Sequence, residues 1–504
     1  MAHGVTPSFN ANPLDAMEWD GFDYLVPDVD KVVPNARLPQ GLATIDALKL
    51  LAESMSADDP ADSTIPAPYT YFGQFIDHDI TLTTAAGPTD PDREVNKPFF
   101  DPLDPTNIPG VLKNRRTSGF DLDCLYGLQP VPGEEDLAVP FAGDKFVIGL
   151  VSAVGNRPPG AADDNDLPRV ERGRPNFRRA RIGDPRNDEN IIVAQLHLAF
   201  LKFHNAVVDD GFSFADARKL VTQHYQWLVL TDFLPRICDP SVVRSVLQKG
   251  NRLYRARNGE KFMPLEFAVA AYRFGHSMVR SVYDFNRNFR KSGAVQAPGR
   301  LDFLFRFTGL KGDLGGSQDT LPENWIVEWD MMLQDHAMQI DPTLTPFLMD
   351  MPNESPDLMK KLATRNLFKG YLFSLPTGQA LAEALLPVEQ RMTPADVIAA
   401  CRPGRPGEKS QGEILESSGL HKTTPLWFYV LAEAKWWRGR GNHLGPLGSL
   451  IVSETIIGLI RENPESVLNR PFLPTLGTEI GRFDLQDLFI KAGVLNSRVA
   501  TRVA

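Results

Sequence analysis

Hydrophobic residues recur at every third or fourth position over much of the chain, the spacing that places them on one face of an α-helix. The pattern is clearest at Asn190–Asp209, where Asp188 or Asn187 is placed to cap the start of the helix. The same spacing predicts helices at Leu42–Ser54, Ser213–Phe233, Asp239–Lys249, Pro264–Arg280, Glu328–Gln339, Met359–Tyr371, Gln379–Leu386, Thr393–Ala400, Thr424–Trp437, Gly448–Arg461 and Phe483–Ala492. The fold is therefore predicted to be mainly α.

Segments rich in Pro, Asp and Asn lie between these helices. Residues 1–65 are typical of an irregular arm laid over a larger body. Loops are expected at Ala85–Arg116 and at residues 128–180, where short apolar runs such as Lys145–Val151 favour strands. The sequence contains no internal repeat or heptad array. We predict one large helical domain at residues 66–504, with long irregular loops and few short strands.

Composition places the chain among soluble globular proteins. Of the 504 residues, 42% are hydrophobic and 23% charged, and no apolar run reaches the roughly eighteen residues of a membrane span. The first twenty residues lack the basic start and apolar core of a secretory signal. Three scattered cysteines cannot form a disulfide framework, and a net charge of −10 argues against nucleic-acid binding. We expect a cytoplasmic protein, or one exported without a recognisable N-terminal signal.

One apolar stretch, Gly73-Gln-Phe-Ile-Asp-His-Asp79, holds an unusual concentration of polar groups. On a helix, Gln74 and His78 share a face, Asp77 lies one step around, and Asp79 points elsewhere. An amphipathic turn with one hydrogen-bonded histidine is the alternative interpretation.

A second candidate site is the loop Thr117-Ser-Gly-Phe-Asp-Leu-Asp123, in which oxygen-bearing residues alternate. Carboxylates, hydroxyls and backbone carbonyls are the ligands that Ca²⁺ prefers. The spacing differs from that of the EF-hand loop, and an ordinary Asx-rich turn would show the same alternation.

Several histidines lie on predicted helices. His276 stands in an apolar segment, where a neutral imidazole is either hydrogen-bonded in the core or bound to a metal. His197 and His204 lie seven residues apart on one helical face without the acid of a zinc motif, which favours structural roles for both.

Taken together, these features are the parts of a haem peroxidase: a Gln and a His on one helical face, an Arg three residues before a Glu at a helix start, and a His in an apolar helix. The sequence resembles the animal-type haem peroxidases of the peroxidase–cyclooxygenase superfamily, and specifically their bacterial members. Besides the two stretches above, the motifs that carry the resemblance are Gly183-Asp-Pro-Arg-Asn-Asp-Glu189, His197 to Asn205, Tyr272-Arg-Phe-Gly-His276, Asn366 before Leu375-Pro-Thr-Gly378, and Gly445-Pro-Leu-Gly-Ser-Leu-Ile-Val-Ser-Glu454.

The resemblance implies a buried haem b and a role for each motif residue. His78 would be the distal acid–base, with Gln74 orienting peroxide and Arg186 as the distal arginine. His276 would bind the haem iron, and Asn366 would accept a hydrogen bond from the other nitrogen of its ring.

Further residues match family positions around the haem. Arg273 would pair with a haem propionate, and Asp77 and Glu189 match the two carboxylates that form ester bonds to haem methyl groups, so at least one such bond is expected. Asn190 stands where myeloperoxidase has a methionine, so no sulfonium link is expected. Calcium would be bound by Asp79, Thr117, the Gly119 carbonyl, Asp121 and Asp123.

Two further departures bear on the surroundings of the haem. Lys369 and Tyr371 replace arginines, which puts part of the charge network around the propionates in doubt. Dioxygenases carry a radical-forming tyrosine three residues before the proximal histidine. Arg273 occupies that place here, and on an α-helix Tyr272 would be rotated away by about 100°.

The expected activity is reduction of hydrogen peroxide and, through a ferryl intermediate, oxidation of halide, thiocyanate or phenolic donors, in a response to oxidative stress. A haem-dependent fatty-acid dioxygenase is the alternative enzyme. A haem- and calcium-binding module that senses or stores haem is the alternative outside enzymes. The sequence leaves the oligomeric state open.

Overall fold

The structure, a computed structural model, describes residues 21–58, 61–85, 91–108, 112–127, 134–162, 164–257, 259–351, 360–404 and 407–499. The first twenty residues, on which the expectation of no secretory signal rests, lie outside this range.

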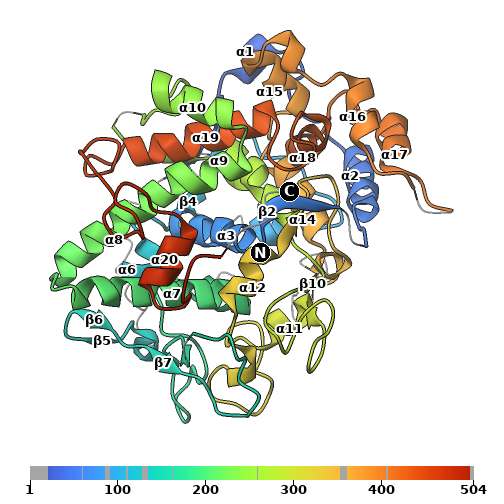
Figure 1. The fold of residues 1–504 in the computed structure, drawn as a ribbon. Helices are drawn as coiled ribbons and strands as arrows, with labels where there is room; N and C mark the ends of the chain where they lie inside the picture. Colours follow the sequence, from blue (N-terminus) through green and yellow to red (C-terminus); the bar gives the residue numbers. More distant parts are fainter. Residues whose placement is uncertain are drawn as a thin grey trace.

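The architecture is mainly helical, as predicted. Helix α3 (Pro68–Ile80) runs through the middle of the molecule and contacts α7 (Ile191–Asp209) and the short helices η3 (Pro185–Asp188) and η6 (Ala271–His276) (Figure 1). The other helices that the figure labels or that are used below are α1 (Val29–Val32), α2 (Leu42–Ser54), α6 (Asp123–Tyr126), α8 (Phe214–Leu228), η4 (Val229–Phe233), α9 (Leu234–Ile237), α10 (Pro240–Lys249), η5 (Glu266–Ala270), α11 (Leu301–Arg306), α12 (Trp329–Gln334), α14 (Leu362–Leu372), α15 (Gly378–Leu385), α16 (Pro394–Ala400), α17 (Gln411–Ser418), α18 (Leu426–Trp436), α19 (Pro446–Arg461) and α20 (Leu485–Lys491).

Short strands join parts of the chain that are distant in sequence. One sheet has the order β3-β4-β1-β9, in which β1 runs parallel to β9 and antiparallel to β4. Strand β2 pairs with β12, and three further pairs of strands form small separate sheets. The strands are β1 (Gly21–Asp23), β2 (Asp62–Pro66), β3 (Thr83–Ala85), β4 (Leu112–Asn114), β5 (Phe141–Ala142), β6 (Lys145–Phe146), β7 (Gly149–Leu150), β8 (Asn165–Asp166), β9 (Phe262–Pro264), β10 (Val282–Tyr283), β11 (Gly299–Arg300) and β12 (His336–Met338). Through β1 and β2, residues of the predicted arm are hydrogen-bonded to the body of the protein.

The prediction of a single α-helix at Pro264–Arg280 is wrong. The chain forms the π-helix η5 and then the 3₁₀-helix η6, and Ala270 between them leaves helical geometry, with φ −130° and ψ −74°. The side chains before His276 therefore do not follow the 100° rotation per residue of an α-helix.

Two other expectations need correction. Helix α7 is capped by Asn190, whose Oδ1 accepts from the Val193 amide at 3.0 Å, because the preceding residues form the separate turn η3. The helix predicted at Glu328–Gln339 ends at Gln334, where the chain turns into β12. Helices α11 and α17 were not predicted, whereas α2 has the predicted bounds.

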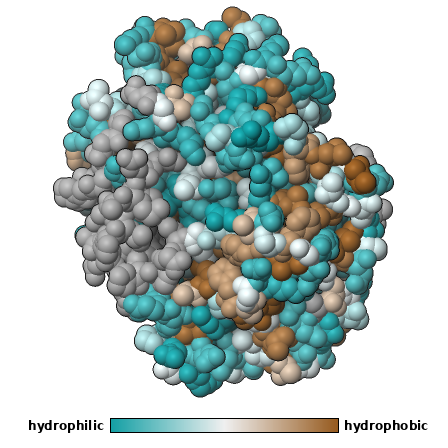
Figure 2. Space-filling view, turned by 90° about the vertical axis from the view of Figure 1, so that its left-hand side faces the viewer, coloured by the Kyte–Doolittle hydropathy of each residue, from teal (hydrophilic) through white to brown (hydrophobic). Residues whose placement is uncertain are grey.

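Helix α7 is the one helix among the described residues that is long and apolar enough to cross a membrane, and 78% of its most hydrophobic window is buried inside the structure. Such burial is typical of a core helix. On the face shown in Figure 2, hydrophobic residues gather near the middle, with hydrophilic residues above and below.

Candidate active site between α3 and η6

Close packing against the core fixes the position of α3. Pro68 occupies its first turn, where the missing amide hydrogen costs no hydrogen bond. Gly73 allows a close approach to neighbouring elements, since a Cβ there would lie 3.3 Å from the ring of Phe233 and 3.9 Å from the hydroxyl of Tyr272. Every other residue of the helix is buried, including all four polar residues of the central stretch. The polar groups of α3 are thus held inside the protein.

A cavity lies between α3 and η6. Four of the predicted site residues line it: Gln74 and Asp77 from α3, and Arg273 and His276 from η6. The remaining lining residues are Tyr69, Thr70, Gly73, Tyr272, Phe274, Gly275 and Met278. Four predicted site residues do not line the cavity: His78, Arg186, Glu189 and Asn366. His78 belongs to α3, and the other three are hydrogen-bonded to residues of α3 or η6.

Residues at the start of α7 hold Gln74 in place. The Nε2 group of Gln74 donates to Oε1 of Glu189, and its Oε1 accepts from Nδ2 of Asn190 at 3.1 Å. Asp77 accepts a hydrogen bond from the Thr81 hydroxyl at 2.9 Å. Burial raises the pKa of Asp77 to about 6, although the charges of Arg186 and Arg273 oppose the shift. The two carboxyls expected to bond to haem thus lie beside the cavity-lining face of α3.

His78 is fully enclosed and contacts Asn187. Its Nδ1 lies 2.8 Å from Oδ1 of Asn187. Burial and the nearby charge of Arg186 lower the pKa of the imidazole to about 3. His78 is therefore neutral at ordinary pH, which is the state that a proton acceptor requires.

Arg186 is placed at the C-terminal end of α3. Its Nη2 donates to the carbonyl oxygens of Thr81 at 2.7 Å and His78 at 3.2 Å, and its guanidinium also pairs with Asp184 at 2.7 Å. A cation at this end of a helix is favoured by the helix dipole. These contacts of Arg186 thus hold α3 and bring a positive charge close to His78.

A buried arginine, Arg116, and the partly buried Arg186 share Asp184. Arg116 lies 2.5 Å from Asp184 and 3.2 Å from Asp123. Although burial alone would raise the pKa of Asp184, the charges of Arg116 and Arg186 hold it well below its ordinary value. An ionic chain thus connects Arg186 to the acidic loop that was predicted to bind calcium.

On the opposite side of the cavity, Asn366 bridges His276 and Arg273. Its Oδ1 accepts from Nη1 of Arg273 at 2.7 Å, and its Nδ2 lies 2.7 Å from Nδ1 of His276. Because a guanidinium only donates, Oδ1 must face Arg273 and the amide nitrogen must face the imidazole. In this arrangement His276 accepts at Nδ1 and carries its proton on Nε2. Metal binding at Nε2 requires the amide to turn over and Arg273 to leave it.

Buried cations gather beside Arg273. Lys369 lies 2.6 Å from Asp92, and Arg365 is completely buried one residue before Asn366. Burial lowers the pKa of Lys369, and the charges of Arg273 and Arg365 lower it further, while Asp92 opposes the shift. Crowded cations in a buried site favour an anionic ligand such as a carboxylate. Lys369 thus forms an ion pair with Asp92 near Arg273.

Tyr371, the other departure from the family pattern, has a different contact. Its hydroxyl accepts from the Gly41 amide at 3.0 Å. This hydrogen bond ties α14 to the residue that precedes α2.

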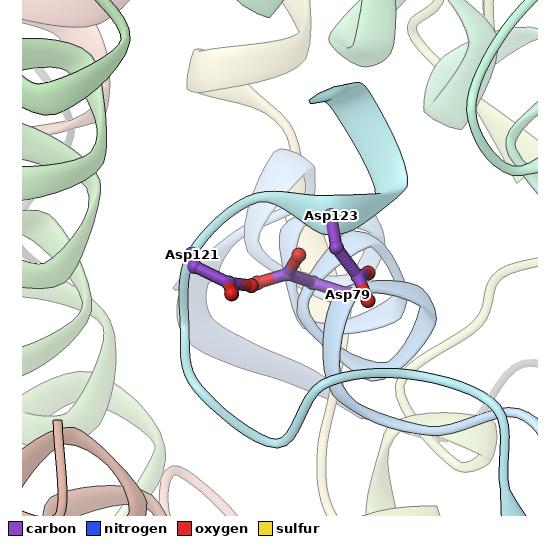
Figure 3. Close-up of side chains that lie close together, drawn as sticks. All are labelled: Asp79, Asp121 and Asp123. Carbon is purple, nitrogen blue, oxygen red and sulfur yellow. The ribbon is translucent and has the colours of Figure 1, made fainter. Parts of the chain in front are cut away.

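The acidic loop meets α3 at the predicted cation site. Carboxylate oxygens of Asp79, Asp121 and Asp123 lie within 4.8 Å of one another (Figure 3). Burial and the two neighbouring carboxyls raise the pKa of Asp79 well above its ordinary value, and that of Asp123 rises to about 6. The Thr117 hydroxyl lies 2.7 Å from Asp121, while the Gly119 carbonyl accepts from Asn463 at 3.3 Å. Three carboxylates and a hydroxyl form an oxygen donor set that suits a hard cation.

Sequence reasoning missed the residues that position these groups. Asn187 and Asp184 lie inside a motif that was quoted for its Arg and Glu, and Arg116 comes directly before the acidic loop. Arg365 precedes Asn366 in the same way. The available signal was a charged or polar residue inside a motif or directly beside it.

The fold is mainly helical, and the histidine-bearing elements α3 and η6 lie on opposite sides of one cavity. The sequence model of the animal haem peroxidase family matches residues 114–370, so the chain belongs to that family. A peroxidase-like protein of Margaritifera margaritifera is 28% identical over 314 residues, which are 51% of this chain and 36% of that protein. The chain thus spans about a third of the length of this relative.

Solved structures share the fold. Peroxidase A of Dictyostelium discoideum superposes with a TM-score of 0.55 over 99% of this chain and 98% of that one, at 16% identity. Fatty acid alpha-dioxygenase of Oryza sativa, solved with palmitic acid, gives a TM-score of 0.54 over 95% and 77% of the two chains, at 15% identity. The Arabidopsis thaliana fatty acid alpha-dioxygenase gives 0.55 over 95% and 75%, at 14% identity.

Proposed function

We propose that this protein is a haem peroxidase that reduces hydrogen peroxide and oxidises small donors: halide, thiocyanate or phenolic compounds. One observation carries the proposal: Gln74 and Asp77 from α3 face Arg273 and His276 from η6 across one cavity, in a chain of the animal haem peroxidase family. Haem b would lie between these elements and, when bound, supplies the electron-transfer chemistry with peroxide and donor.

The residues present fit such a group. His276 would hold the iron, and the cation cluster of Arg273, Arg365 and Lys369 would neutralise the two propionates. Burial and the charge of Arg365 lower the pKa of Arg273 to about 10, so an added carboxylate there relieves repulsion between cations.

The distal residues would move and orient protons. His78 would take the proton from one peroxide oxygen and deliver it to the leaving oxygen. Gln74, held by Glu189 and Asn190, would donate to or accept from peroxide and water in the cavity. The charge of Arg186 favours negative charge on the leaving oxygen.

The test is the absorption spectrum of purified, haem-supplemented protein before and after addition of peroxide, followed by a panel of bromide, iodide, thiocyanate and phenols. We expect a Soret band that changes with peroxide and returns when a donor is added. A Soret band that does not change when peroxide is added would contradict the proposal and favour a haem-sensing or haem-storing module.

The fatty-acid dioxygenase remains the second candidate because of Tyr272. This residue lines the cavity and its hydroxyl is buried, whereas α-helical geometry would have turned it away. Oxygen uptake with an unsaturated fatty acid, measured on the same preparation, separates the two functions. A rate of oxygen uptake with the fatty acid that exceeds the rate of oxidation of every donor in the panel would favour the dioxygenase.

Ester bonds to haem are expected to form under peroxide through Asp77 and Glu189. Denaturing extraction of peroxide-treated protein should leave haem attached to the polypeptide. Asp77→Asn and Glu189→Gln should each remove one link, and the double variant should release all haem, because an amide does not form the ester. Release of all haem from the wild-type protein after peroxide treatment would refute the prediction.

Calcium is expected to bind where Asp79, Asp121 and Asp123 meet and to stabilise the folded protein. At a calcium concentration about 100 times the Kd, the gain is roughly 2.7 kcal/mol. Thermal unfolding should shift to higher temperature with Ca²⁺ and back with a chelator. Asp121→Asn is the cleaner variant, because Asp123 also pairs with Arg116. If Ca²⁺ raises the unfolding temperature of Asp121→Asn as much as that of the wild-type protein, the ion binds at another site.

A further inference from the structure

We propose that Arg116 sets the charge selectivity of the acidic cluster, because its buried positive charge lowers the net negative charge that a bound cation meets. The acidic cluster consists of three carboxylates that lie together: Asp79, Asp121 and Asp123 (Figure 3). The inference rests on the calcium binding proposed above, and it does not depend on the reaction with peroxide. Arg116 lies outside the predicted set of calcium ligands.

The acidic cluster contains an oxygen that no described protein group satisfies. Asp79 is fully buried, and its Oδ2 has no hydrogen-bond partner among the described residues. Its Oδ1 accepts from the Cys124 amide at 3.4 Å. A buried acceptor without a partner costs free energy, and carboxylates within 4.8 Å of one another repel. Both features point to a cation as the partner of the cluster.

Arg116 contacts the acidic cluster from inside the protein. Its Nη1 donates to Oδ1 of Asp123 at 3.2 Å and to the Asp123 carbonyl at 3.3 Å. Its Nη2 donates to Oδ2 of Asp184 at 2.5 Å and to the Gly183 carbonyl at 3.1 Å. A guanidinium only donates, whereas carboxylates and carbonyls only accept. The direction of all four contacts is therefore fixed by chemistry.

The guanidinium keeps both its charge and its place. Although burial alone would lower the pKa of Arg116, the charges of Asp184 and Asp123 raise it above its ordinary value. The Arg116 side chain is 0% exposed and Asp184 is 1% exposed. Buried charges are screened much less than charges on the surface. Arg116 thus places an unscreened positive charge beside the acidic cluster.

This charge acts more strongly on a trivalent ion than on a divalent one, because the repulsion between Arg116 and a bound ion grows with the charge of the ion. Carboxylates bind a cation in their ionised form. Three ionised carboxylates and one guanidinium carry a net charge of −2, which balances a divalent ion. Without Arg116 the cluster would carry −3. Arg116 therefore favours Ca²⁺ over Tb³⁺, a trivalent ion that also takes oxygen ligands.

Calorimetric titration of the full-length, haem-supplemented protein, first freed of cations with a chelator, measures the affinities for Ca²⁺ and for Tb³⁺. Arg116→Gln removes the charge and keeps an amide that donates. It should raise the ratio of Tb³⁺ affinity to Ca²⁺ affinity by roughly 10–100-fold, the Coulomb effect of one unit charge several ångströms away at the effective dielectric of a protein. Arg116→Lys keeps the charge and should keep the wild-type ratio. An equal ratio in Arg116→Gln and the wild-type protein would overturn the proposal.

Asp184→Asn tests the same charge from the other side. Removing this carboxylate leaves Arg116 with Asp123 as its remaining ionic partner, so more of its positive charge acts on the acidic cluster. The ratio of Tb³⁺ affinity to Ca²⁺ affinity should fall, the opposite of the change in Arg116→Gln. An unchanged or higher ratio would contradict the proposal. This variant leaves Arg116 intact, so it decides even if Arg116→Gln does not fold.

Lys261→Gln is the matched control for a charge on the solvent side of the acidic cluster. A Cβ at Gly119 would lie 3.5 Å from Nζ of Lys261 and 3.3 Å from Oδ2 of Asp121, so the lysine is close to the cluster. Because Lys261 is partly exposed, solvent screens its charge. The ratio should change less than in Arg116→Gln. A larger change in Lys261→Gln would assign the selectivity to the surface charge instead.

The titrations also separate failure of this inference from failure of the calcium prediction. If the wild-type protein binds neither ion, the calcium prediction fails and the role of Arg116 fails with it. If both ions bind and no variant changes the ratio, calcium binding stands and only the role of Arg116 fails. The reaction with peroxide enters neither result, so the proposed peroxidase activity is judged by its own test.

Discussion

Replacing His78 with alanine should slow the reaction with peroxide by roughly 10²–10⁴-fold, the usual contribution of a positioned acid–base group. His78 is buried, neutral and held at Nδ1 by Asn187, so its ring is ready to take up a proton. Rapid mixing of haem-loaded protein with peroxide, followed at the Soret band, measures the rate. Haem should remain bound, because His78 does not line the cavity and is not the residue proposed to hold iron.

The matched control is His421→Ala, at a partly buried histidine in the loop between α17 and α18. This variant should react with peroxide at the wild-type rate. Near-normal kinetics in His78→Ala would refute the assignment of the acid–base group. Loss of haem from His78→Ala would instead indicate that the residue supports the cavity.

The sequence predicted that the polar side chains of the stretch that forms α3 diverge, because this depends on local spacing. Gln74 lines the cavity and Asp79 turns to the acidic loop, as expected, but Asp77 lines the cavity and His78, which was expected to share the face of Gln74, does not. The motif spacing also placed His276 and Arg273 in one segment, and both line the same cavity. Sequence separation thus predicts the approximate direction of a side chain on a helix, but not which side chains reach the cavity.

The failures occur where the chain leaves α-helical geometry or where distant charges meet. Tyr272 was expected to face away, but the change from π to 3₁₀ geometry at Ala270 places it in the cavity. No local pattern predicts the change from a π-helix to a 3₁₀-helix, because the spacing of hydrophobic residues in this segment also fits a continuous α-helix. The pairing of Arg116 with Asp184 joins residues 68 positions apart, which periodicity does not report.

The direction of the hydrogen bond between Asn366 and His276 is also not predictable from the sequence. The family resemblance implies that Asn366 accepts from His276, and the contact is present at 2.7 Å. Its direction depends on Arg273, which occupies the amide oxygen. A third residue thus decides which ring nitrogen carries the proton, and only the folded structure brings that residue into place.

Replacing His276 with alanine should abolish stable haem binding. Loss of an outer partner of a metal ligand alone costs about 10–100-fold in affinity, so loss of the ligand itself should cost more than about 100-fold. Titration of the haem-free protein with haem, followed at the Soret band, measures the affinity without any assay of activity. Asn366→Ala should fall between His276→Ala and the wild-type protein, because it removes only the partner of the imidazole.

Two further measurements separate ligand loss from collapse of the cavity. Free imidazole should restore the Soret band in His276→Ala if the cavity keeps its shape, since it can occupy the place of the missing ring. Arg273→Leu removes the donor that fixes the Asn366 amide. Loss of the partner for a propionate should lower the haem affinity of this variant, whereas easier rotation of the Asn366 amide should raise it. Haem affinity of His276→Ala equal to that of the wild-type protein would show that another side chain holds the iron, and would remove the basis for placing haem between α3 and η6.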